Sequence, residues 1–189
     1  DLVGPGGGFR THPHKNMEIV TYVTHGTLAH EDSLGHRTQI PAGDLQVMSA
    51  GTGIRHSEFN ASDAEAVHLL QIWILPNELD AQPRYEQQTM RVESDVLQCV
   101  ASGTGKEGSM TLRADAEIYR LRMEPGQTVD LPFSPDRQVW VQVVSGDLAV
   151  DGEALSVVAV SGKNWTPEGA TVEAMGTGAE ALVFNLPLS

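Results

Sequence analysis

Residues 12–58 read HPHKNMEIVTYVTHGTLAHEDSLGHRTQIPAGDLQVMSAGTGIRHSE, and this stretch carries the features that decide the fold. His12 and His14 stand at its start, and His56 and Glu58 stand at its end. Alternate residues of a β-strand share a face, so each pair would project two donor side chains to the same side. Three imidazoles and one carboxylate from two strands form a ligand set suited to iron, manganese, nickel, copper or zinc.

The sequence around these pairs predicts an all-β fold. Short runs rich in β-branched and aromatic residues alternate with glycine and proline turn signals at spacings of about 8–12 residues, as in β-barrels and sandwiches. No stretch shows a long apolar repeat at the helical period. The expected strands are residues 17–24, 27–31, 45–49, 54–59, 67–75, 96–101, 110–112, 116–123, 138–144, 147–150, 155–160, 171–174 and 182–186.

A polar, proline- and glutamine-containing stretch follows the apolar run at residues 67–75. We therefore expect a first domain over residues 1–80, a linker over 81–95 and a second domain over 96–189. The chain begins at Asp1 without an initiator methionine, and we expect at least one further strand upstream of it.

The two halves carry a weak internal repeat at an offset of about 120 residues, which includes Gly-x-Leu-Ala in both copies. At that offset the ligand candidates are replaced by Pro132, Ser134, Met175 and Thr177. All seven histidines lie within the first 68 residues. The sequence therefore predicts a metal site in the first half only.

Composition excludes several classes of protein. A net charge of -13 and only 12 Lys and Arg argue against a surface that binds nucleic acid non-specifically. The single cysteine, Cys99, excludes an intrachain disulfide framework and fits a reducing compartment, so we expect a cytoplasmic protein. No apolar run reaches the length of a membrane span, and no signal peptide is visible.

Two segments carry a family resemblance. Residues 6–26 fit G-x5-HPH-x3-E-x7-G, nearly the first cupin motif. Residues 35–46 fit G-x5-PAG-x2-Q, the second motif except at Gln46, where a typical cupin has histidine. Together with the whole of residues 12–58, the chain closely resembles the pirin family, which includes bacterial pirin-like quercetin 2,3-dioxygenases. The resemblance is dense over residues 4–80 and looser at the end of the chain.

The resemblance implies a bicupin, in which two cupin β-barrels (double-stranded β-helices) pack face to face. It also implies one mononuclear divalent transition metal, usually iron, in the first barrel. By position the ligands would be His12, His14, His56 and Glu58. Glu18 stands where many other cupins place their carboxylate ligand, and it is the competing candidate. Zinc, nickel, copper, manganese or cobalt could occupy the same ligands.

The same resemblance implies a dioxygenase that opens the ring of a flavonol such as quercetin with O2. The metal would act as Lewis acid and template, and Glu58 could take the hydroxyl proton of the substrate. The alternative is a non-enzymatic, iron-dependent redox sensor that binds a transcription factor or a metabolic enzyme, which the acidic balance also fits. We expect a monomer, with no direct nucleic-acid or membrane partner.

The remaining candidates have simpler interpretations. His68 lies in an apolar run, which favours a core or pocket-lining position with a satisfied ring. His25, His30 and His36 flank turns and are expected to face solvent. Cys99 is expected in the core. Glu31 and Asp32 are adjacent in a predicted strand, so their side chains should point to opposite faces.

Overall fold

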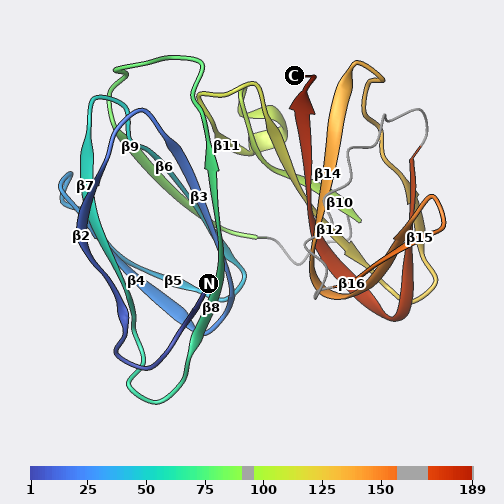
Figure 1. Ribbon diagram of the computed structural model, residues 1–189, viewed down its shortest axis with the longest axis horizontal. Coiled ribbons are helices and arrows are strands. Elements are labelled where there is room, and N and C mark those ends of the chain that lie inside the picture. The colour runs from blue at the N-terminus through green and yellow to red at the C-terminus, as the bar shows by residue number, and fades with distance from the viewer. Residues whose placement is uncertain (91–95, 157–169, 189) are drawn as a thin grey trace. The chain divides into compact units, whose positions relative to one another are not determined.

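The computed structural model describes residues 1–90, 96–156 and 170–188, and the regular secondary structure of these residues is almost entirely β-strand (Figure 1). The exception to the β structure is a short 3-10 turn at Lys106–Gly108. No helix in these ranges is long and apolar enough to cross a membrane. The all-β prediction is therefore confirmed.

The chain divides into two compact units. The first is Asp1–Arg91 with Met110–Ala114, and the second is Val92–Ser109 with Asp115–Ser189. The division differs from the expected domains in two ways. The first unit extends past residue 80, and a short segment around β11 (Met110–Thr111) belongs to it rather than to the second.

The first unit consists of two antiparallel sheets. One sheet has the order β1-β8-β3-β6-β9, formed by Leu2–Val3, Val67–Ile74, Glu18–His25, Asp44–Ser49 and Arg84–Thr89. The other has the order β2-β7-β4-β5, formed by Gly8–His14, Ile54–Asn60, Thr27–Asp32 and Arg37–Pro41. In Figure 1 the unit runs from blue to green, with β2 and β7 side by side.

Strand β9 lies inside the segment expected as a linker. Residues 84–89 pair with β6 along its whole length, with Arg84 opposite Ser49 and Thr89 opposite Asp44. This strand carries two glutamines and no apolar alternation, so its sequence gives no strand signal. Its pairing with the buried strand β6 holds it in place.

The interior of the first unit is layered. One apolar cluster joins the sheets at one end through Ile19, Met48, Ala50 and Ile54. A second cluster joins them at the other end through Val23, Leu28, Ile40, Val67 and Leu69. Along each strand, the inward-facing residue between these two clusters is polar, because inward positions recur at every second residue. On β3 that residue is Thr21, and on β7 the inward positions after Ile54 are His56 and Glu58.

The second unit is a separate antiparallel sheet structure. Its order is β10-β12-β16-β14-β15, with β13 beside β16, formed by Leu97–Ser102, Glu117–Met123, Thr171–Pro187, Arg137–Val150, Glu153–Ser156 and Thr128–Asp130. Its core is apolar and contains Cys99, as expected. Residues 157–160 of the strand expected over 155–160 lie outside the described residues.

Two long strands replace four expected short ones in the second unit. Residues 138–144 and 147–150 are one strand, β14, and residues 171–174 and 182–186 are one strand, β16. Gly146 adopts φ +72° at a point where the β14–β16 register shifts. Gly146 therefore lies at an irregularity inside one continuous strand rather than in a turn between two strands.

Candidate metal centre

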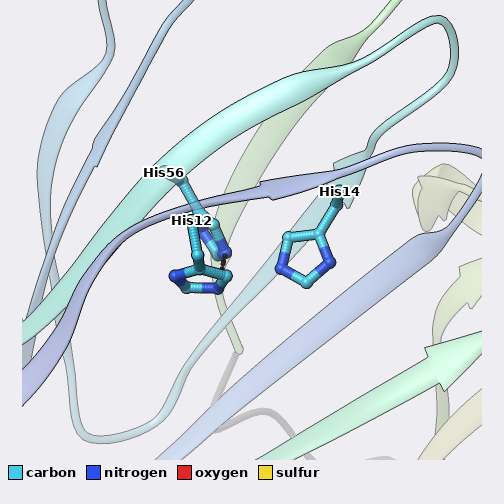
Figure 2. A group of neighbouring side chains, drawn as sticks. All are labelled: His12, His14 and His56. Carbon is cyan, nitrogen blue, oxygen red and sulfur yellow. Dashed lines mark hydrogen bonds between the residues drawn. The ribbon is translucent and has the colours of Figure 1, made fainter.

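Three histidine rings converge at the place where β2 pairs with β7. His12 lies directly opposite His56 in this pairing, and His14 follows two residues further along β2. The ring centroids are 4.4 Å apart for His12 and His56, 4.8 Å for His12 and His14, and 4.9 Å for His14 and His56. Figure 2 shows the three rings turned toward one another, two from β2 and one from β7.

The nitrogen atoms of these rings are arranged as metal ligands need to be. The His12 Nδ1–H donates to the Arg10 carbonyl at 2.8 Å, which leaves Nε2 as the free nitrogen. That Nε2 faces the Nε2 of His56 at 3.0 Å. The Nε2 of His14 is buried and has no hydrogen-bond partner among the described residues. A buried polar atom without a partner is costly, and a bound cation would satisfy it.

Glu58 lies close to the same centre. A carboxylate oxygen of Glu58 lies within 4.8 Å of a ring nitrogen of His56 and of a ring nitrogen of His30. The ring nitrogens of His56, His12 and His14 also lie within 4.8 Å of one another. The Gln71 Nε2–H donates to Glu58 Oε2 at 2.8 Å and orients the carboxylate. Glu58 Oε1 is buried and unpartnered within the described part of the chain. His56 is therefore shared by two groups of possible metal ligands, one with His12 and His14 and the other with His30 and Glu58, and such nitrogen and oxygen donors suit a divalent transition metal.

Burial and the charges of neighbouring histidines lower the pKa of two of these rings, those of His56 and His14. Desolvation, followed by the charges of His12, His30 and His14, lowers the pKa of His56 to about 3. Desolvation and then the charge of His12 lower the pKa of His14. A neutral imidazole is the form that binds a metal. Burial raises the pKa of Glu58, against the opposing effects of the Gln71 hydrogen bond and of His12.

His30 was predicted to face solvent, and that prediction is wrong. Its side chain is fully buried, and its Nε2 lies 3.2 Å from Asp32 Oδ2, which is also fully buried. Asp32 further accepts hydrogen bonds from His36 Nδ1 at 2.9 Å and from the backbone N–H groups of Leu34 and His36. His30 faces inward because it alternates with Leu28, a signal that the sequence contained.

The competing carboxylate, Glu18, lies on the other face of β3. Ile19 and Thr21 face the interior, so Glu18 points away from the rings. Its Oε2 accepts hydrogen bonds from Ser49 Oγ at 2.7 Å and from the Arg113 N–H at 3.1 Å. Two donors already satisfy this buried carboxylate, and the structure does not bring it to the histidines.

The other histidines lie apart from the centre. His68 is half-buried, and its Nδ1 lies 3.0 Å from Thr24 Oγ1, which agrees with a satisfied ring. His25 is exposed, as expected. His36 is half-buried and stacks on Tyr85 at 4.7 Å. Glu31 is exposed while Asp32 is buried, which confirms that the two carboxylates point to opposite faces.

Two surface clefts border the sheet that carries the rings. The first has a volume of about 460 Å³ and is lined by the proposed ligand His14 together with Pro13, Lys15, Ser33, Gly53, Ile54 and Arg55. The second has a volume of about 400 Å³ and is lined by His30 together with Ala29, Glu31, Arg37, Thr38, Gln39, Ser57 and Phe59. The exposed Trp73 packs edge-on against the half-buried His14, with the two ring centroids 5.2 Å apart.

The fold and these four side chains define a two-unit β protein of the cupin type with a candidate metal centre in its first unit. The family model described as "Pirin" matches residues 1–74, and the model described as "Quercetinase C-terminal cupin domain" matches residues 99–186. The quercetin 2,3-dioxygenase of Escherichia coli (strain K12) is 42% identical over 99% of this chain and 80% of that protein. The chain belongs to the pirin family.

Solved structures agree with this assignment. The crystal structure of YhhW from Escherichia coli has a TM-score of 0.90 and 41% identity, over 100% of this chain and 79% of that chain. The structure of the bacterial pirin YhhW in complex with nickel(II), from the same organism, has the same TM-score and identity over 80% of its chain. YhaK from Escherichia coli, at 21% identity and a TM-score of 0.84, shares the fold.

Proposed function

We propose that the protein is a metal-dependent dioxygenase that opens the central ring of a flavonol such as quercetin with O2. The observation that carries this proposal is the convergence of His12, His14, His56 and Glu58, with His14 Nε2 and Glu58 Oε1 buried and unpartnered within the described residues. The similarity to the Escherichia coli quercetin 2,3-dioxygenase supplies the reaction class.

The metal would be held by the three histidines and Glu58, and we propose Fe(II) as the native ion. The structure of YhhW in complex with nickel(II) supports a divalent transition metal in the present protein as well. Three imidazoles and one carboxylate leave coordination positions open on an octahedral ion, which is what a catalytic site needs. When bound, the metal supplies Lewis acidity and a template for a chelating hydroxyl and carbonyl pair.

The chain's own residues then bind the substrate and take its proton. Glu58 Oε1 is an acceptor for the proton of the 3-hydroxyl, since it is buried and has no hydrogen-bond partner among the described residues. Gln71 keeps the other carboxylate oxygen fixed. Trp73 is 57% exposed beside His14 and offers an apolar wall for a planar ring.

The overall reaction conserves the atoms of both reactants. One quercetin and one dioxygen give one ring-opened ester and one carbon monoxide, and both dioxygen atoms are retained in the products. A test loads the metal-free protein with Fe(II) anaerobically, adds quercetin and then admits oxygen. We expect loss of the flavonol absorbance together with release of one carbon monoxide per flavonol. Absence of both changes would contradict the proposal, and Glu58→Gln should slow them at least a hundredfold.

A further inference from the structure

A row of polar side chains crosses the interior face of the sheet opposite the histidines. Thr21 on β3 lies directly opposite Gln46 on β6 and directly opposite Gln71 on β8. Residues directly opposite each other in a sheet project to the same face. Gln71 reaches Glu58 at 2.8 Å, so this face is the one that looks toward the proposed metal ligands.

The side chains of two members of the row have no hydrogen-bond partner among the described residues. Thr21 and Gln46 are both 0% exposed. The hydroxyl of Thr21 and both the oxygen and the nitrogen of the Gln46 amide are unpartnered within the described ranges. Gln71, the third member, donates a hydrogen bond to Glu58 and accepts one from Trp73. Burial of three polar atoms without hydrogen bonds is unfavourable, so these atoms point to a ligand.

The surroundings show that these polar side chains are not part of a general polar interior. On β3, Ile19 and Val23 stand on either side of Thr21, and each belongs to an apolar cluster. On β6, Met48 stands beside Gln46 and is also in a cluster. Valine or leucine at the two polar positions would continue the apolar packing, whereas threonine and glutamine interrupt it.

The chemistry of the two side chains defines what they can bind. The Gln46 amide offers one acceptor and one donor group, and the Thr21 hydroxyl can act as either. Neither carries charge, so the pair suits a neutral hydroxyl rather than an anion or a cation. A flavonol chelated through its 3-hydroxyl and 4-carbonyl presents its next oxygen, the 5-hydroxyl, on the same edge of the ring system.

The exposure of the surrounding side chains indicates how a chelated flavonol would be oriented. His14 and Trp73 are accessible to solvent, whereas Thr21 and Gln46 are wholly buried. The apolar rings of a chelated ligand therefore extend toward Trp73, and its oxygen-bearing edge lies toward the buried polar row. We propose that Thr21 and Gln46 form a hydrogen-bonding subsite for the 5-hydroxyl of a metal-bound flavonol, and thus determine substrate specificity. This inference rests on the proposed function.

Quercetin and fisetin test the subsite, because they differ only in the presence of the 5-hydroxyl. Binding of each to the iron-loaded protein is measured without oxygen, by titration of the flavonol absorbance, so that no turnover is needed. We expect the unmodified protein to bind quercetin about tenfold more tightly than fisetin. Gln46→Met and Thr21→Val should bring this ratio close to one by weakening quercetin binding, with fisetin binding little changed.

A matched control and a second measurement separate binding from folding. Thr24→Val removes a hydroxyl from the same strand, one that bonds His68 rather than facing the polar row, and should keep the tenfold ratio. In the metal-free protein, Gln46→Met removes an unpartnered buried amide, so its melting temperature should be equal or higher. A fall of several degrees would show that the amide serves folding and would overturn the proposal.

The outcomes distinguish this inference from the proposed function. Two results would contradict the subsite while leaving flavonol binding intact. One is that the unmodified protein binds quercetin and fisetin with equal affinity. The other is that the tenfold ratio of the two affinities persists in both Gln46→Met and Thr21→Val. If neither flavonol binds the iron-loaded protein, the proposed function fails and the subsite fails with it.

Discussion

Acid should destabilise the metal-free protein, and the ring of His56 should account for a measurable part of the effect. His56 is 1% exposed, and its pKa falls from the ordinary 6.5 to about 3. Between these values the unfolded chain binds a proton that the folded chain excludes, so stability decreases as the pH falls from 6.5 toward 3. At about 1.4 kcal/mol for each pH unit, the full effect is about 5 kcal/mol, and about 2 kcal/mol is reached by pH 5.

The neighbouring groups change the size of this effect but not its sign at His56. Burial lowers the pKa of His14 and His30 as well, so both add to the loss at low pH. Glu58 acts in the opposite direction, because burial raises its pKa and its folded form holds a proton more tightly. Comparison of one variant with the unmodified protein at two pH values isolates the single ring.

The assay is urea unfolding of chelator-treated protein at pH 7 and pH 5. The unmodified protein should lose about 2 kcal/mol more between these two pH values than His56→Gln, which lacks the titrating ring. His25→Gln, at an exposed position, serves as the control and should behave as the unmodified protein. Equal pH dependence in the unmodified protein and in His56→Gln would refute the burial argument.

Three further substitutions test the residues that hold the metal ligands and the surrounding fold in place. Gln71→Leu removes the donor to Glu58 and should weaken metal binding about 10–100-fold with little change in fold, as measured by competition with a chelating dye. Asp32→Asn weakens the hydrogen bonds that this buried group accepts from His30 and His36 and should cost about 1–3 kcal/mol in urea unfolding at pH 7. Gly26→Ala places a Cβ 2.8 Å from a backbone oxygen at φ +76°, so it should destabilise by more than about 1 kcal/mol in the same assay.

Strand alternation made much of the centre predictable. The i, i+2 spacing of His12 with His14, and of His56 with Glu58, fixes which side chains share a face whatever the rest of the fold does. The pairing of His12 with His56 spans 44 residues, and no local signal in either strand specifies that register. The resemblance to the pirin family supplied that long-range link.

The features that the sequence did not predict correctly also have local causes. His30 was placed by its nearness to a turn, although its alternation with Leu28 carried the better signal. Strand β9 has no apolar period, since one edge of a sheet can be held by backbone pairing alone. The sequence predicts a turn at Gly146 because a glycine can adopt positive φ either in a turn or at an irregularity within a strand, and only the pairing with the partner strand distinguishes the two.

Metal content of the purified protein and of single variants is the most direct measurement of the central claim. Elemental analysis should find about one transition-metal ion per chain in the unmodified protein, and almost none in His14→Ala and His56→Ala. His36→Ala should retain the ion, because His36 contacts Asp32 and Tyr85 rather than the three converging rings. Unchanged metal content in all three variants would contradict a centre built from these histidines.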